Sequence, residues 1–250
     1  MLSKSQIKKL RGLQRKKERL NSGLFVVEGK KIVAEMLQSS LPFVELYALD
    51  SWFKQNPSYL KGGNCFVLTE KDLAQVSTLK TPNEVLLVLK QKKESSFDEV
   101  SNQALVLAVD GINDPGNLGT IIRLADWFGV NSILCTSNTV DQYNPKTVQS
   151  AMGSINKVQL FYGDLSEMLC NLKSHTIYAS DLNGDSIYST DFSEKTVLLM
   201  GSESHGISDE ILSLVSKKVT IPTFSKSGVD SLNVATATAI VLSEYRSRGY

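Results

Sequence analysis

Hydrophobic residues in the C-terminal part of the chain occur in short continuous runs separated by longer segments of mixed polarity. The first run, at 104–110, reads ALVLAVD. Runs of this kind are typical of strands buried on both faces of a parallel sheet. Further strands are predicted at 132–136, 157–162, 176–180, 197–201 and 218–221. Helical patterns, including those at 118–128 and 208–215, separate most of them, so this region is predicted to be an α/β domain.

The N-terminal part alternates helical and extended patterns on a smaller scale. Ile7, Leu10 and Leu13 lie at helical spacing, which predicts a helix from Ser3 or Ser5 to Leu20. Strands are predicted at 24–27, 43–49, 65–68 and 84–89, and helices at 30–38, 51–60 and 70–77. This alternation is typical of a small α/β layer domain.

A polar stretch, QKKESSFDEVSN at 91–102, separates the two patterns. Polar segments without periodicity are typical of linkers. The chain is therefore predicted to contain a small α/β domain at 1–91, a linker at 92–103 and a larger α/β domain at 104–250.

The composition limits the classes of protein to which the chain can belong. The chain has 250 residues, of which 42% are hydrophobic and 21% charged, as expected of a globular protein. Its apolar runs are much shorter than the ~20 residues of a membrane span, and its first residues lack a secretory pattern. Three cysteines without a C-x-x-C pair favour neither a disulfide framework nor a zinc site. We therefore expect a cytoplasmic protein without membrane or metal partners.

Charge is distributed unevenly along the chain. Residues 1–31 hold ten Lys or Arg against two Glu, a net charge of +8, whereas the remainder holds 17 basic and 24 acidic residues, a net charge of −7. A basic arm on an acidic body indicates a polyanionic partner such as RNA, although a solvated terminal helix has the same composition. The candidate RNA-binding residues in this arm are Lys8, Lys9, Arg11, Arg15, Lys16 and Arg19.

Unusual residues gather in the loops that follow three predicted strands. Ligands of open α/β sheets bind beyond the carboxyl ends of strands. The first loop, DGINDPGNLGT at 110–120, is neither a G-x-G-x-x-G nor a P-loop motif, but it leads into a helix whose free N–H groups favour anions. Arg123 lies off the apolar stripe of that helix. It is a candidate ligand contact, or it pairs with Asp126.

The second and third loops offer further candidates. In LMGSESHGI at 199–207, Glu203 is either a ligand contact or a solvated charge, and His205 is either a general base or exposed polar surface. In the third segment, Asp230 or Ser231 is expected to cap the following helix. Capping alone would also account for Ser231 and Asn233.

Three motifs together resemble a known family. NDPGNLGTIIR at 113–123, MGSESHGIS at 200–208 and IPTFSKSGVDSLNVATA at 221–237 resemble the signature motifs of the SpoU family of RNA ribose 2′-O-methyltransferases, within the superfamily of knotted methyltransferases. The resemblance covers about 104–250. Residues 5–90, with FVVEGKKIVAEML at 25–37, resemble the ribosomal-protein-like substrate-binding domain that often precedes it.

The resemblance implies a fold, a cofactor and a site. The C-terminal domain would contain a deep trefoil knot that binds S-adenosylmethionine, and the protein would be a homodimer with its active site near the interface. The cofactor-binding positions implied by the motifs are Met200, Gly201, Ile221, Ser231, Leu232 and Asn233. The implied catalytic positions are Asn117, Arg123, Glu203, Ser231 and Asn233.

Arg123 matches the residue that the family is thought to use as general base. A guanidinium remains protonated in proteins, so we expect Arg123 to hold the target phosphate and stabilise the developing alkoxide instead. The two-domain organisation favours ribosomal RNA as the substrate, by analogy only. The alternatives are a transfer RNA 2′-O-methyltransferase, a knotted enzyme that methylates a base, and a non-catalytic RNA-binding homologue.

Overall fold

The structure, a computed structural model, describes residues 2–39, 42–62, 64–92, 96–225 and 231–249. The chain forms two compact units, one of Met1–Lys93 with Tyr143–Gly153 and one of Glu94–Gln142 with Ser154–Tyr250. A short segment from the middle of the chain thus belongs to the first unit. The domain boundaries expected from the sequence stay a prediction.

The first unit is built on a four-stranded mixed sheet with the order β1-β4-β2-β3. Strand β4 is antiparallel to both of its neighbours, and β2 is parallel to β3. All four strands predicted for this region are confirmed. Their bounds are β1 (Leu24–Glu28), β2 (Phe43–Leu49), β3 (Cys65–Leu68) and β4 (Val85–Lys90).

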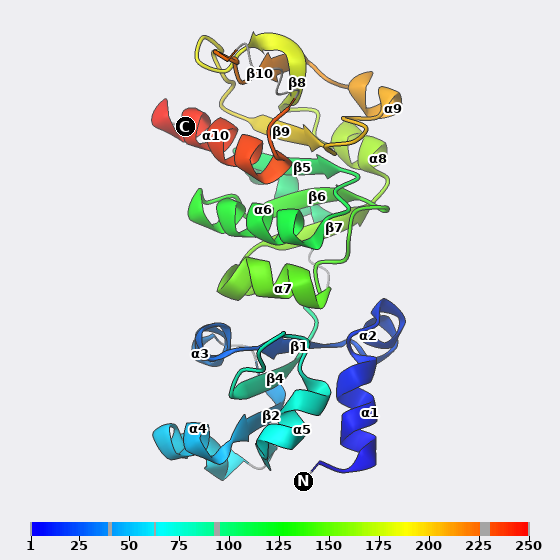
Figure 1. The fold of residues 1–250 in the computed structure, drawn as a ribbon. Coiled ribbons are helices and arrows are strands. Elements are labelled where there is room, and N and C mark those ends of the chain that lie inside the picture. Colours follow the sequence, from blue (N-terminus) through cyan, green and yellow to red (C-terminus); the bar gives the residue numbers. More distant parts are fainter. Residues whose placement is uncertain (1, 40–41, 63, 93–95, 226–230, 250) are drawn as a thin grey trace. The chain divides into compact units, whose positions relative to one another are not determined.

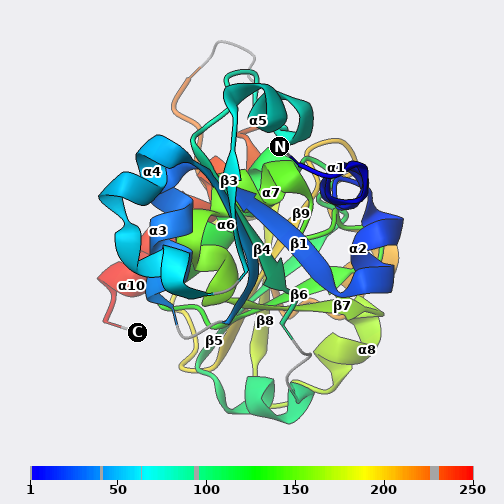
Figure 2. The same ribbon diagram turned by 90° about the horizontal axis from the view of Figure 1, so that it is seen from below.

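Helices lie on both sides of this sheet. Figure 2 shows α1 and α2 on one side of β1, and α3 and α4 on the other. The helical elements of the unit are α1 (Lys4–Gly12), α2 (Lys16–Ser22), α3 (Lys30–Gln38), α4 (Asp50–Gln55), the 3-10 helix η1 (Pro57–Gly62), α5 (Glu70–Val76) and α7 (Pro145–Ala151). The helix predicted at 51–60 is therefore two elements. Thr69 caps α5.

The single helix predicted from Ser3 or Ser5 to Leu20 is wrong. Ser3 caps α1, but α1 ends at Gly12 and a separate helix begins at Lys16. The Arg19 guanidinium donates hydrogen bonds to the carbonyl oxygens of Leu13 and Gln14 at 3.0 and 2.8 Å. These bonds satisfy carbonyl groups that the helix end would otherwise leave free, so a tertiary contact stabilises the break.

The segment 143–153 is tied to the first unit by side-chain contacts. The Tyr143 and Phe25 rings lie 4.6 Å apart, and the Tyr143 hydroxyl accepts a hydrogen bond from the Lys92 amide at 2.9 Å. At the other end, the Gly153 amide donates to a Glu35 carboxylate oxygen at 2.9 Å. Helix α7 lies between these contacts and packs on β1.

The second unit contains a six-stranded sheet with the order β10-β8-β9-β5-β6-β7, in which all neighbouring strands are parallel. The predicted parallel α/β architecture is therefore confirmed. The strands are β5 (Leu105–Asp110), β6 (Ser132–Thr136), β7 (Gln159–Gly163), β8 (Thr176–Ser186), β9 (Thr196–Gly201) and β10 (Lys217–Thr220). Strand β8 is longer than predicted and shifts register against β10 between Lys218 and Val219.

Helices cover both faces of the parallel sheet. Helices α6 and α10 contact each other on one side, and α8 and α9 lie on the other (Figure 1). The core beneath α8 and α9 includes Val106 and Ala108 of β5 with Val197 and Leu199 of β9. The helical elements are η2 (Phe97–Asn102), α6 (Pro115–Trp127), η3 (Met152–Asn156), α8 (Leu165–Cys170), α9 (Asp209–Leu212) and α10 (Val234–Ser247).

The strand register brings two of the predicted loops together. Asp110 at the end of β5 pairs with Gly201 at the end of β9, so both loops leave the sheet at the same level. The Asp110 carboxylate is buried and accepts a hydrogen bond from the Ser208 amide at 2.8 Å.

Among the helices that the structure describes, none is long and apolar enough to cross a bilayer.

Candidate functional site

The first segment presents Asn117 in the first turn of α6. Asp114 is the N-cap residue, and its carboxylate accepts a hydrogen bond from the Asn117 amide at 2.8 Å. Pro115 occupies the first helical turn, where its missing N–H costs no hydrogen bond. The helix start is therefore well fixed, and the Asn117 side chain projects from it.

The second segment turns back on itself directly after β9. Ser202 and Gly206 exchange two backbone hydrogen bonds at 3.0 and 2.9 Å, and Gly206 has a φ of 66°. The backbone of Gly206 approaches Gly201 so closely that a Cβ at position 201 would lie 2.4 Å from the Gly206 carbonyl carbon. Both glycines are therefore required by the geometry of this turn.

The third segment enters α10 through Asn233. The Asn233 side-chain oxygen accepts hydrogen bonds from the amides of Ala235 and Thr236 at 3.1 and 3.2 Å. The helix thus begins later than expected, and the capping role predicted for Ser231 is wrong. Asp230, the other predicted cap, lies outside the described residues.

Glu203 joins the three segments. Its Oε1 atom accepts hydrogen bonds from Asn117 Nδ2 at 3.2 Å, from Asn233 Nδ2 at 2.7 Å and from the Val234 amide at 3.1 Å. Asn233 Nδ2 also donates to Asn117 Oδ1 at 2.9 Å. Asn117, Glu203 and Asn233, one from each of the three segments, are therefore brought together in one cluster.

The Glu203 carboxylate is placed where a negative charge is stabilised. It lies against the N-terminus of α10, whose free N–H groups carry partial positive charge. Its three hydrogen bonds all reach Oε1, and no residue in the described part of the chain donates to Oε2. One oxygen thus holds the cluster together while the other remains available to a ligand.

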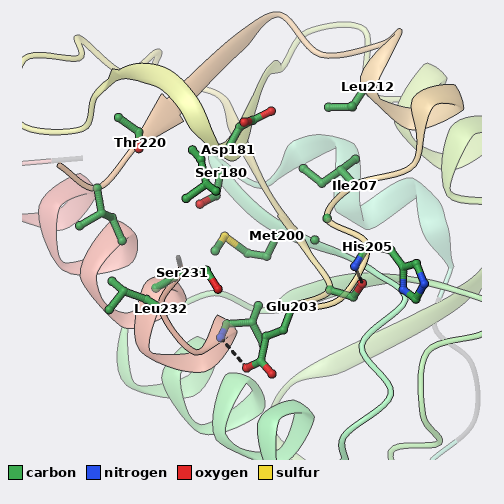
Figure 3. A pocket seen from close by; sticks show the side chains of 17 residues that line it. Ser180, Asp181, Met200, Glu203, His205, Ile207, Leu212, Thr220, Ser231 and Leu232 are labelled. Carbon is green, nitrogen blue, oxygen red and sulfur yellow. Dashed lines mark hydrogen bonds between the residues drawn. The ribbon is translucent and has the colours of Figure 1, made fainter. Parts of the chain in front are cut away.

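A pocket of about 410 Å³ lies beside this cluster. Five predicted cofactor-binding residues line it, namely Met200, Gly201, Ile221, Ser231 and Leu232. Figure 3 shows Glu203 on the same side of the pocket as Ser231 and Leu232, with Met200 at the centre of the view and His205 at the far edge from Leu232. Asn233 does not line the pocket and instead fixes Glu203.

The contribution of β8 to the pocket was not predicted from the sequence. Ser180, Asp181 and Leu182 line it, together with Thr220 at the end of β10. Asp181 forms an ion pair with Lys218 at 2.8 Å and accepts a hydrogen bond from the Asn183 amide at 2.9 Å. The bond from Asn183, followed by that from Lys218, lowers the pKa of Asp181. The rule that ligands bind beyond carboxyl ends of strands applies equally to β8 and was the available signal.

Arg123 lies outside this cluster. It is exposed, has no hydrogen bond or ion pair within the described residues, and lines a separate hollow of about 680 Å³ with Trp127 and Tyr188. The alternative pairing of Arg123 with Asp126 is wrong, because Asp126 instead pairs with Lys157 at 3.0 Å. His205 is exposed, and its backbone amide donates to the Ser202 hydroxyl.

The basic arm residues have different surroundings. Arg19 is only 2% exposed, so its side chain holds the turn between α1 and α2. Lys9 forms an ion pair with Glu45 at 2.8 Å. Arg11 Nε donates to the Gln75 carbonyl at 2.7 Å, and Arg15 lies 3.7 Å from Glu18. Lys8 and Lys16 are exposed and unpaired within the described residues.

Comparisons with known proteins agree with both halves of the sequence. The SpoU rRNA Methylase family matches residues 104–243, and the MRM3-like substrate binding domain matches residues 4–87. The 23S rRNA (guanosine(2553)-2′-O)-methyltransferase RlmP of Bacillus subtilis strain 168 is 31% identical over 98% of this chain and 96% of its own length. An AdoMet-bound rRNA methyltransferase from Sinorhizobium meliloti is 28% identical, with a TM-score of 0.86 over 100% of this chain and 97% of that chain.

Proposed function

This chain belongs to the SpoU rRNA Methylase family, and from that premise we propose that it transfers a methyl group from S-adenosylmethionine to a ribose 2′-hydroxyl of ribosomal RNA. The observation that carries the proposal is the hydrogen-bonded cluster of Asn117, Glu203 and Asn233 beside the pocket. Ribosomal RNA is favoured over transfer RNA because a relative that is similar over 98% of this chain is named as a 23S rRNA enzyme.

The pocket suits this cofactor. Its volume, about 410 Å³, lies in the range of small-molecule sites. Apolar side chains of Met200, Ile221 and Leu232 line it, and Gly201 contributes backbone to the wall. The Glu203 carboxylate lies at the wall and favours a cationic ligand. These residues would therefore hold the adenosine and the sulfonium centre.

When bound, the cofactor supplies an electrophilic methyl group on a sulfonium. The residues of this chain would place the ribose hydroxyl in line with it. Positioning of this kind contributes up to about 7–11 kcal/mol to a rate. Glu203 fixes the side chains of Asn117 and Asn233 beside the pocket, and its second carboxylate oxygen would face the incoming nucleotide or the cofactor.

The proposal includes a homodimer formed through the face made by α6 and α10. Trp127 is 85% exposed there, and Leu124 and Ile240 line the same hollow. An exposed apolar patch of this kind is typical of an interaction surface. Arg123 lies on this face without a partner among the described residues. We therefore assign it to the site of the partner subunit, where it would hold the target phosphate and stabilise the developing alkoxide.

Two further parts of the proposal follow from the family. The second unit is expected to contain the trefoil knot that accompanies these motifs. The protein is expected to act in the cytoplasm, in keeping with three cysteines that are all free thiols.

Methyl transfer from labelled S-adenosylmethionine to ribosomal RNA tests the proposal. A 2′-O-methyl group removes the hydroxyl that alkali needs for cleavage, so we expect the label in alkali-resistant dinucleotides. Label in mononucleotides would indicate methylation of a base and contradict the proposal. Cofactor binding by calorimetry without any transfer to ribosomal RNA would favour a non-catalytic homologue or another RNA substrate.

A further inference from the structure

A basic hollow on the first unit has no role in the site described above. It lies between α1, the turn that follows it and the C-terminal part of α5, and its volume is about 610 Å³. We propose that this hollow binds the sugar-phosphate backbone of the substrate RNA. The inference rests on the proposed function and specifies which surface of the first unit contacts the substrate.

The hollow concentrates positive charge. Its basic lining residues are Lys4, Lys8, Arg11 and Arg15, and none of the described residues that line it is acidic. Lys4, Lys8 and Arg11 follow one another at i, i+4 and i+7, so they lie on one face of α1. At about 1.5 Å per residue they extend over about 10 Å, a length suited to consecutive phosphates of one strand.

The wall that carries these charges is firmly held. Leu10 and Leu13, from the opposite face of α1 and the turn after it, are buried in a core with Leu73 and Val76 of α5. Arg11 Nε donates to the Gln75 carbonyl at 2.7 Å, which fixes the guanidinium, and no other residue in the described part of the chain pairs with its terminal nitrogens. A fixed guanidinium is a strong phosphate ligand because its N–H groups form a planar fork.

The structure also shows which of the basic residues in the N-terminal arm line the hollow, a distinction that the sequence alone does not give. Lys9 is paired with Glu45 and Arg19 is buried, so neither faces the hollow. Lys16 and Lys17 are exposed but do not line it. Lys4, which was not among the predicted RNA-binding residues, does line it.

The lining indicates contacts with backbone rather than with bases. Besides the four cations it contains Ile7, Gly12, Gln14 and Gln75, and no aromatic side chain for stacking on a base. Lysine and arginine contacts to phosphate position an RNA but carry no sequence information. The hollow would therefore hold the RNA while the second unit selects and modifies the nucleotide.

Salt dependence of RNA binding tests the inference with two matched double variants of the full-length protein. Lys4→Gln with Lys8→Gln removes two charges from the hollow, and Lys16→Gln with Lys17→Gln removes two from the neighbouring segment. The probe is a ribosomal RNA fragment that the wild-type protein methylates. Each lost phosphate contact lowers the slope of log affinity against log salt by about 0.7 for single strands.

For the double variant of Lys4 and Lys8, called the hollow variant, we expect a slope about 1.4 smaller in magnitude than that of the wild type. The double variant of Lys16 and Lys17 should keep the wild-type slope. Between 50 and 200 mM salt, the affinity of the wild type should fall about sevenfold further than that of the hollow variant. Equal slopes for the wild type and the hollow variant, or equal losses for both variants, would overturn the inference. Unchanged S-adenosylmethionine affinity verifies that each variant is folded. A wild type that binds cofactor but methylates no ribosomal RNA would instead refute the proposed function.

Discussion

Replacing Gly201 by alanine tests the cofactor pocket most sharply. The new Cβ would lie 2.4 Å from the carbonyl carbon of Gly206, 2.6 Å from its oxygen and 2.7 Å from the Ile207 nitrogen. All three are backbone atoms, so a side-chain rotation cannot relieve the contact. The turn formed by Ser202 and Gly206 must move instead, which weakens the two backbone hydrogen bonds that close it.

The magnitude follows from these contacts. Overpacking of this kind typically costs about 1–3 kcal/mol. Two backbone hydrogen bonds at about 0.5–1.5 kcal/mol each give the same range. If S-adenosylmethionine binds only when the turn has its wild-type conformation, the affinity of the variant for it should fall about 5- to 150-fold. The midpoint of thermal unfolding should fall by about 2–12 °C.

Isothermal titration calorimetry and thermal unfolding measure the two effects. Gly163→Ala is a matched control, because Gly163 ends β7 as Gly201 ends β9, and its Cβ would meet only Met168 Cε at 3.9 Å. We expect the control to resemble the wild type. If Gly201→Ala also kept wild-type affinity and stability, the account of the pocket would be refuted.

Four further substitutions test other parts of the account. Glu203→Gln should lower the single-turnover methylation rate at least about tenfold, since charged acceptors form the stronger hydrogen bonds, and an unchanged rate would exclude a role for the carboxylate. Arg123→Lys should lower the same rate without changing cofactor affinity, because lysine lacks the planar fork, and full activity would contradict the role of Arg123. Trp127→Glu should convert a dimer into a monomer in light scattering, and a dimeric variant would disprove the interface. Asp181→Asn should lower the free energy of unfolding at pH 7, because the lowered pKa of Asp181 means that its ionised form stabilises the fold above the ordinary carboxyl pKa. The wild type loses this stabilisation below about pH 4, so the stability of the variant should fall less steeply in acid, and identical acid unfolding of the two proteins would argue against this.

Much of the fold could be predicted from the sequence because its strands have clear hydrophobic patterns. The run at 104–110 is apolar up to Asp110 and forms the fully buried strand β5, and β2, β3 and β6 have the bounds that were predicted. Local patterns do not report tertiary contacts, however. The break between α1 and α2 depends on the Arg19 guanidinium, and the membership of 143–153 in the first unit depends on contacts of Tyr143 and Gly153.

The site was predictable to a similar extent. The motifs identified the residues of the cluster, and the structure brings Asn117, Glu203 and Asn233 together. The role of Glu203 as the shared hydrogen-bond acceptor could not be predicted, because it arises only when three segments that are distant in the sequence meet. The position of Arg123 in a separate hollow could not be predicted either, since the helical spacing does not show which other segments pack near it.

Mass spectrometry of ribosomal RNA from cells with and without this protein tests the central claim most directly. We predict that one nucleotide of ribosomal RNA loses a ribose methyl group in the absence of the protein and regains it when the wild-type protein is restored, but not when the Glu203→Gln variant is supplied. Ribosomal RNA with an identical set of ribose methyl groups in both cells, or a loss confined to a base or to transfer RNA, would contradict the claim.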